Sequence, residues 1–202
     1  MDRPKVEALF GPTSAPPRCV GALVMAGIDD TLTFYPLNIA VLTISDTRDE
    51  ESDRSGALLA ERVTSAGHSL AGKEIVPDEV EAIRARLKLW IGDPAVELDI
   101  TTGGTGFAPR DVTPEAVKPL LQREMDGFSV LFHQASLGTI GLSTLQSRAF
   151  AGQAGDTFIF CLPGSTGACR DGWDLVLGLE LDSRYRPCSL AGQIPRLRAI
   201  CA

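Results

Sequence analysis

The strongest constraint on the fold of this 202-residue chain is the run from Ile39 to Ile44. Every residue in it is apolar or β-branched, and a run without polar alternation is typical of a strand buried on both faces. Val96 to Thr102 and Thr157 to Leu162 are predicted to be further strands, and His68 to Val76 a weaker one. Strands of this kind belong to parallel sheets that carry helices on both faces.

Segments with apolar residues at helical spacing lie between these strands. Their start and stop signals are Ser55 and Gly67 for the first, Pro77-Asp78-Glu79 and Gly92 for the second, and Thr113-Pro114 for the third. A further helix follows Pro163, and residues 128–150 are expected to form short helices around Gly138 and Gly141. The alternation of strands and helices predicts an α/β fold, a three-layer doubly wound domain with a mainly parallel sheet.

The domain is expected to span residues 38–202. Residues 1–37 differ from the rest in composition, because five prolines are spread among small residues. We expect this segment to form a loosely ordered N-terminal extension. A chain of this length closes one sizeable core, whereas two domains would both be undersized.

Composition excludes several classes of protein. The net charge of −7 argues against a surface for duplex nucleic acid, because such affinity comes from Lys and Arg. The five cysteines form no Cys-x-x-Cys pair, and with two histidines neither a zinc site nor a disulfide framework is indicated. No stretch approaches the roughly 20 apolar residues of a membrane span, and prolines interrupt any signal-peptide core. We therefore expect a cytoplasmic protein that binds neither nucleic acid nor membrane.

Two loops at predicted strand ends are candidate anion sites. Thr102-Gly103-Gly104-Thr105-Gly106 has glycines that let the backbone approach a ligand and threonine hydroxyls that complete a cradle. It lacks the Gly-Lys-Ser/Thr of a Walker loop and the third glycine of a dinucleotide fingerprint, so an ordinary glycine-rich turn is the alternative. In Pro163-Gly164-Ser165, helix N-terminal amides would hold a phosphate. The alternative there is that Ser165 only caps the following helix.

Asp78 and Asp111 are the candidate catalytic carboxylates. Both follow predicted strands, and a doubly wound sheet would bring them to the same rim. Asp78 has a structural alternative, because with Glu81 it resembles a capping box. A capping role does not account for Asp111, because Thr113 is the more favourable N-cap residue for the following helix. Two carboxylates near a phosphate cradle suggest Mg²⁺, which prefers a few carboxylate oxygens together with substrate phosphates.

Other polar residues are weaker candidates. Ser147 and Arg148 are possible anion contacts, whereas His68 and His133 are expected to be structural. The acidic loop Asp46–Asp53 is predicted to be a solvated surface. No Ser-His-Asp order and no Cys-His pair is compelling.

The order of these motifs resembles the MoaB/Mog family of molybdenum cofactor biosynthesis proteins, over roughly residues 38–190. The most specific piece is the glycine loop followed by Arg-Asp-Val-Thr-Pro-Glu-Ala. Pro163-Gly164-Ser165-Thr166 with Ala168-Cys169-Arg170 is more similar to the MoaB branch than to the Mog or gephyrin branch. The other matching motifs are Ser45-Asp46-Thr47-Arg48, Asp53 through Ser55-Gly56, Pro77-Asp78 and Ser147-Arg148-Ala149.

The resemblance implies a molybdopterin adenylyltransferase. In that reaction the terminal phosphate of molybdopterin attacks the α-phosphate of ATP in the presence of Mg²⁺, giving adenylyl-molybdopterin and pyrophosphate. On matching positions, Asp78 and Asp111 would be the catalytic, metal-associated carboxylates, and Thr102 to Gly106 would bind the nucleotide phosphates. Ser45, Ser147, Arg148 and the Pro163 loop would line the substrate site. The resemblance also implies a homotrimer or a homohexamer.

Two other functions stay open at this point. One is a binding or delivery protein that holds molybdopterin without adenylylating it, for which Asp78 and Asp111 would be dispensable. The other is a nucleotide-pyrophosphate hydrolase, because competence/damage-inducible proteins carry a related domain. The presence of both aspartates favours an enzyme.

Overall fold

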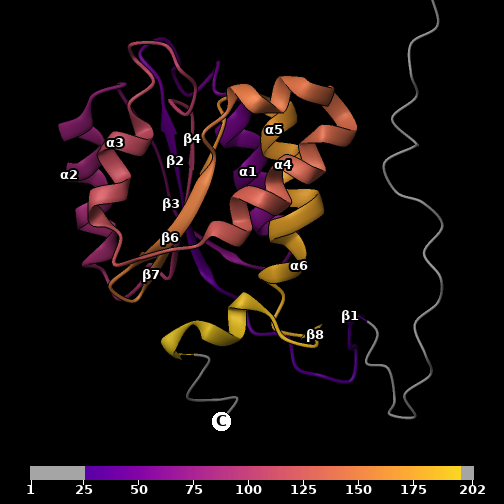
Figure 1. Cartoon of the computed structure of the whole chain (residues 1–202). Helices are drawn as coiled ribbons and strands as arrows, with labels where there is room; N and C mark the ends of the chain where they lie inside the picture. The colour runs from indigo at the N-terminus through magenta and orange to yellow at the C-terminus, as the bar shows by residue number, and fades with distance from the viewer. Residues whose placement is uncertain (1–25, 197–202) are drawn as a thin grey trace, which may run out of the picture.

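A six-stranded sheet forms the centre of the computed structural model, which describes residues 26–196 (Figure 1). The strands run in the order β3-β2-β4-β7-β6-β5. The first four are parallel, whereas β6 is antiparallel to β7 and β5 is antiparallel to β6. Their bounds are β2 Asn38–Ile44, β3 Ser69–Val76, β4 Leu98–Thr102, β5 Arg123–Glu124, β6 Phe150–Ala154 and β7 Thr157–Leu162. The sheet is therefore mixed and mostly parallel.

Helices cover both faces of this sheet, α2 and α3 on one side and α1, α4, α5 and α6 on the other (Figure 1). The α-helices are α1 Arg54–Ser65, α2 Val80–Ile91, α3 Thr113–Val117, α4 Asp126–Ile140, α5 Thr166–Gly172 and α6 Gly178–Glu180. The shorter turns are η2 Lys118–Leu120, η3 Gly141–Gln146, η4 Trp173–Leu177 and η5 Leu190–Gln193. No helix in the described part of the chain is long and apolar enough to cross a membrane. The predicted three-layer α/β fold is confirmed.

The side chains of β2 divide between two cores. Ile39 and Val41 face the core that the sheet shares with α1, α4 and α5, whereas Ala40 and Leu42 face the core shared with α2. All four side chains are fully buried. Helices on both faces are the reason that this stretch of sequence carries no polar alternation.

One carboxyl group lies inside this core. Asp99 of β4 is fully buried, and neither of its carboxylate oxygens has a hydrogen-bond partner within residues 26–196. Burial raises the pKa of this carboxyl well above its usual range. The protonated, uncharged form of Asp99 is thus favoured more than that of an exposed carboxyl.

The expectation of short helices around Gly138 and Gly141 holds only in part, because the short helix η3 starts at Gly141 but Gly138 lies inside a long one. A single helix, α4, runs through Gly138, and Gly141, with φ +59°, ends it. Phe128 and Phe132 are buried on this helix with their ring centroids 6.1 Å apart, and Phe128 also packs edge-on against β7. The packing of these rings outweighs the low helix propensity of glycine.

The start of α1 also differs from the prediction. Asp53, not Ser55, is the N-cap, since its Oδ1 accepts a hydrogen bond from the Gly56 N–H at 2.8 Å. The Ser55 hydroxyl donates instead to the Gly164 carbonyl at 2.8 Å, which ties α1 to the loop after β7. Gly67, with φ +88°, follows the helix as predicted.

Residues 26–37, which the sequence groups with the extension, pack on the domain. Within them β1, Gly27–Ile28, pairs antiparallel with β8, Tyr185–Arg186. Leu37 is fully buried in the larger core. The packed unit therefore starts before residue 38, because these residues bury apolar side chains and complete a small second sheet. The part of the expected extension before residue 26 lies outside the described residues.

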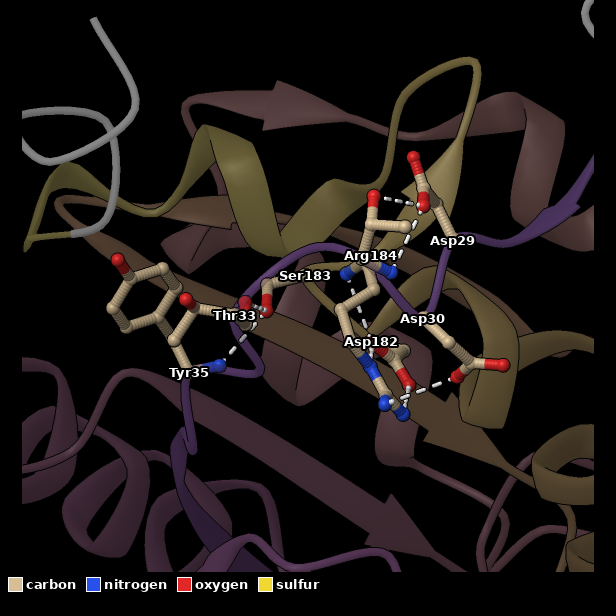
Figure 2. A network of polar contacts seen from close by, with 8 residues as sticks. Asp29, Asp30, Thr33, Tyr35, Asp182, Ser183 and Arg184 are labelled. Atoms are coloured by element: carbon tan, nitrogen blue, oxygen red, sulfur yellow. Dashed lines mark hydrogen bonds and ion pairs between the residues drawn. The ribbon is translucent and has the colours of Figure 1, made fainter.

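Polar contacts reinforce this connection (Figure 2). The Tyr35 N–H donates to the Ser183 hydroxyl at 2.9 Å, and that hydroxyl donates to the Thr33 carbonyl at 3.3 Å. The Arg184 guanidinium, held within its own segment by the Asp182 carboxylate, donates through Nη1 to Asp30 Oδ1 at 3.5 Å. Two segments far apart in the sequence are thus joined by side-chain as well as main-chain bonds.

Two truncations test where the packed unit begins. Removal of residues 1–24 is expected to leave the melting temperature within about 2 °C, because their scattered prolines and small residues show no regular apolar spacing. Removal of residues 1–36 is expected to lower it by about 5 °C or more, since the contacts of Phe34 with His68 and of Tyr35 with Ser183 are lost. Calorimetry on the three proteins measures both shifts. Equal melting temperatures in both truncated chains would contradict the contribution of residues 26–36.

A second prediction concerns Asp99. The pKa of Asp99 is higher in the folded chain than in the unfolded chain. At a pH between these two pKa values, the folded chain therefore holds a proton on Asp99 that the unfolded chain has released. The free energy of unfolding contributed by this group therefore falls as pH rises from about 4. Asp99→Asn does not titrate, so the stability difference between variant and wild type should shift in favour of the variant from pH 5 to pH 8, measured by urea unfolding. A pH-independent difference would show that burial does not raise the pKa of Asp99.

Candidate active site

The loops that follow β2, β3, β4 and β7 enclose an open cavity of about 850 Å³ at one edge of the sheet. Parallel strands share this carboxyl edge, which is where doubly wound domains bind ligands. Every residue predicted for the site except Arg148 lines this cavity. The set is Ser45, Asp78, Thr102, Gly103, Gly104, Thr105, Gly106, Asp111, Ser147, Pro163, Gly164 and Ser165.

The glycine loop, Gly103–Gly106, packs closely against neighbouring strand ends. Gly103 has φ +112° and Gly104 has φ +62°, backbone conformations that favour glycine. A Cβ on Gly103 would overlap the Ile44 carbonyl at the end of β2. A Cβ on Gly104 would come within 3.1 Å of Asp78 Oδ1. Packing therefore demands glycine at both positions, and it places Asp78 directly beside the loop.

Two polar side chains hold the glycine loop in place. Thr113 Oγ1 donates to the Gly103 carbonyl at 2.8 Å, and it makes no capping bond to α3. Arg148 donates through Nε to the Gly106 carbonyl at 2.8 Å and through Nη2 to the Asp111 carbonyl at 2.7 Å. The prediction that Thr113 caps α3 is therefore wrong. The prediction that Arg148 contacts an anion in this cavity is wrong. Its guanidinium binds carbonyls of the loop and does not line the cavity.

Asp78 and Asp111 face the cavity from different loops, and the main chain holds one oxygen of each. Asp78 Oδ2 accepts from the Asp46 N–H at 3.0 Å, and Asp111 Oδ2 accepts from the Ala108 N–H at 2.7 Å. No donor in the described part of the chain reaches Oδ1 of either residue, so each keeps one oxygen for a ligand. The capping alternative for Asp78 is wrong, because the N-cap position of α2 is Glu79 and carries no side-chain cap bond.

Nearby charges act on the Asp78 carboxyl. Burial raises its pKa, and the negative charges of Asp46 and Asp111 raise it further. The hydrogen bond from the Asp46 N–H and the positive charge of Arg110 lower the pKa, but the net shift is upward. A cation beside these carboxylates would offset their repulsion. Among residues 26–196 no three His, Cys, Asp or Glu side chains are grouped to hold a metal by themselves. The site thus fits an ion such as Mg²⁺ that shares its coordination between carboxylates and substrate oxygens.

The loop after β7 closes another side of the cavity. Its Pro163 carbonyl accepts from Thr102 Oγ1 at 2.9 Å, which joins it to the start of the glycine loop. Ser165 Oγ accepts from the Ala168 N–H at 3.2 Å and caps α5. The capping alternative for Ser165 is confirmed, and the residue also lines the cavity.

The acidic loop after β2 forms part of the cavity wall, which the sequence did not predict. Arg48 and Arg54 line the cavity and bring positive charge to it. Asp53 is only 2% exposed, accepts from Thr43 Oγ1 at 2.8 Å and lies 3.2 Å from Lys73 Nζ. The prediction of a solvated surface is wrong for Asp53. An Asp just before a helix start is a capping signal that identifies it. Arg48 belongs to the matched motif Ser45-Asp46-Thr47-Arg48, whereas no pattern marks Arg54.

The two histidines lie outside this cavity. His68 Nδ1 accepts from the Leu37 N–H at 3.1 Å, and burial lowers the pKa of its imidazole. His133 Nδ1 lies 2.8 Å from Thr144 Oγ1. Both have the structural roles that the sequence predicts.

Comparison with known proteins identifies relatives of this chain. Residues 40–182 match the family described as "Probable molybdopterin binding domain". The chain is 47% identical over 156 residues to "Molybdenum cofactor biosynthesis protein B" of Escherichia coli (strain K12), which covers 77% of this chain and 92% of that protein. It is 45% identical over 150 residues to the protein of the same name from Staphylococcus epidermidis, covering 72% and 85%.

Solved structures agree with these matches. A crystal structure of Molybdenum cofactor biosynthesis protein B superposes with a TM-score of 0.70 at 41% identity, over 73% of this chain and 92% of that one. The molybdopterin biosynthesis enzyme MoaB from Thermus thermophilus superposes with a TM-score of 0.64 at 35% identity, over 71% and 91%. The chain belongs to the MoaB branch of the molybdopterin-binding MoaB/Mog family, whose members take part in molybdenum cofactor biosynthesis.

Proposed function

We propose that this chain is a molybdopterin adenylyltransferase, which transfers AMP from ATP to molybdopterin in a magnesium-dependent reaction. The observation that carries the proposal is the meeting of Asp78, Asp111 and the glycine loop in a single open cavity. The names of the relatives, which include a molybdopterin biosynthesis enzyme, support the substrate. The two arginines of the cavity wall would contact an anionic ligand, and the carboxylates of the same wall favour one that brings a cation.

In the proposed reaction a terminal phosphate oxygen of molybdopterin attacks the α-phosphorus of ATP. The bond from that phosphorus to the oxygen bridging to the β-phosphate breaks, and pyrophosphate leaves. This chemistry needs alignment and charge neutralisation more than a protein nucleophile. We assign the nucleotide phosphates to the glycine loop and the molybdopterin phosphate to Ser45, Ser147 and the Pro163 loop. Arg48 and Arg54 would offset negative charge in the cavity.

Asp78 and Asp111 would hold Mg²⁺ through the oxygens that the main chain leaves free. Bound there, the ion would neutralise charge on the phosphate oxygens. The contribution of the chain itself is to keep two carboxylates beside the glycine loop, so that a nucleotide bound to the loop lies against them.

Asp111→Asn and Asp78→Asn are each expected to lower kcat by about a hundredfold or more. Each asparagine keeps an oxygen for its main-chain donor, so the melting temperature should stay within about 3 °C, while the negative charge is lost. The measurement is the amount of adenylyl-molybdopterin formed from molybdopterin, ATP and Mg²⁺. Asp156→Asn, in the exposed turn before β7 at the opposite edge of the sheet, is the matched control and should keep wild-type turnover.

The same assay separates the competing functions. Normal turnover in both asparagine variants would reject the roles given to the two carboxylates. A wild-type chain that binds molybdopterin without forming the adduct would be a binding or delivery protein. Release of AMP and pyrophosphate without an adduct would identify a nucleotide-pyrophosphate hydrolase.

We also propose that the chain works as a homo-oligomer, a trimer or a hexamer. Apolar side chains are exposed at the end of α4 and along η3, and exposed patches of this kind mark protein interfaces. They are Leu137 (47% exposed), Ile140 (51%), Leu142 (75%) and Leu145 (72%). Because η3 ends at Gln146, which lines the cavity together with Ser147, a second copy on this face would border the site.

Charges on this face should break the oligomer. Leu142→Asp combined with Leu145→Asp is expected to yield a folded monomer, because two charges cannot be buried without partners. Leu89→Asp on α2, where the side chain is 63% exposed, is the matched control and should keep the wild-type mass. Light scattering after size-exclusion chromatography measures the mass. A double variant that keeps the wild-type mass would place the interface elsewhere.

A further inference from the structure

Asp46 makes a reciprocal contact with Asp78. Its N–H donates to Asp78 Oδ2, and its Oδ1 accepts from the Asp78 N–H, both at 3.0 Å. These bonds join the loop after β2 to the loop after β3. With Oδ2 held in this way, the other oxygen of Asp78 lies beside the glycine loop. The contact therefore sets the direction of the Asp78 carboxylate.

Arg110 connects the same Asp46 carboxylate to a third loop. Its Nε donates to Asp46 Oδ2 at 2.8 Å, and its Nη2 donates to Asp46 Oδ1 at 2.7 Å. A contact of two parallel bonds between arginine and carboxylate restricts orientation as well as distance. Arg110 directly precedes Asp111 in the loop after β4. Asp46 is thus bonded to both loops that carry the aspartates.

We propose that the Asp46–Arg110 ion pair positions Asp78 and Asp111 relative to each other beside the glycine loop. The inference rests on the proposed adenylyl transfer. Neither member of the pair lines the cavity, so both act through the two aspartates and not on the substrate. Their side chains are 37% and 56% exposed, and exposed ion pairs add little to stability. Variants of the pair should therefore fold, and a loss of turnover would report on positioning.

The chain contains a matched ion pair away from the site. Arg62 donates to Asp174 through Nε at 2.9 Å and through Nη2 at 3.2 Å, and the two side chains are 31% and 38% exposed. This pair joins α1 to η4, and neither residue lines the cavity. Breaking it removes the same kind of contact without touching the loops of the site.

Arg110→Met removes the guanidinium and keeps an apolar stem, and Arg62→Met does the same at the control pair. Arg110→Met is expected to lower kcat by about ten- to a hundredfold, with the KM for ATP changed by less than about threefold. Arg62→Met should keep wild-type kcat, with a melting temperature similar to that of Arg110→Met. Asp46→Asn keeps an oxygen for the Asp78 N–H and should lose less activity than Asp46→Ala. Adding Asp46→Asn to Arg110→Met should cause no further loss, because residues that act as a unit are not additive.

Amide hydrogen exchange gives a second measurement that does not depend on turnover. The N–H groups of Asp46 and Asp78 each donate to the other's carboxylate, so their exchange reports on the contact between the two loops. Both are expected to exchange faster in Arg110→Met and at the wild-type rate in Arg62→Met.

Three results would overturn the positioning role. They are wild-type kcat in both Arg110→Met and Asp46→Ala, an equal loss of kcat in Arg62→Met, and unchanged amide exchange in Arg110→Met. A wild-type chain that forms no adenylyl-molybdopterin would refute the proposed reaction instead. In that case the exchange comparison still decides whether the ion pair holds the two loops together.

Discussion

The site is built around the contact between the glycine loop and the ends of the neighbouring strands. Any side chain on Gly103 would overlap the Ile44 carbonyl, and a Cβ on Gly164 would lie 3.2 Å from the Gly103 Cα. Loops from β2, β4 and β7 therefore meet at a point where only backbone fits. Thr113 and Arg148 then hold the loop carbonyls. The surface that the loop presents to the cavity is set by packing and hydrogen bonds within the protein, so it is organised before a ligand binds.

The charges of the cavity matter more for its ligand than the charge of the whole chain. The net charge is −7, and five carboxylates line the cavity together with two arginines, Arg48 and Arg54. The carboxylates are Asp49, Glu51, Asp53, Asp78 and Asp111. By themselves they would repel an anion, and the arginines offset part of that repulsion. A phosphate ligand that brings a cation suits both sets of residues, because the cation offsets the carboxylates and the arginines offset the phosphates. Charges a few ångströms from the ligand have a larger effect on it than distant exposed charges, because salt in the solvent screens the distant charges.

Local signals in the sequence predicted strands more reliably than helix caps. The apolar run of β2 is buried on both faces because its alternate residues face two cores. Residue type favours Ser55 and Thr113 as caps, but in the fold Asp53 caps α1 and the two hydroxyls donate to the Gly164 and Gly103 carbonyls. Cap preference depends on the adjacent residues, whereas these carbonyls belong to loops that approach only when the sheet forms.

The α/β class, the position of the glycine loop at a strand end and the choice of the two aspartates as candidates for the site follow from the sequence alone. They rest on hydrophobic periodicity, on glycine and proline punctuation and on a motif order, all of which are visible along the chain. The folded chain alone shows that Arg148 supports the loop, that Arg48 lines the cavity and that Asp46 joins Asp78 to Arg110. These contacts depend on the strand order β3-β2-β4-β7, which decides which loops meet at the sheet edge. The neighbours of a residue in the sequence do not encode which distant group its side chain will reach.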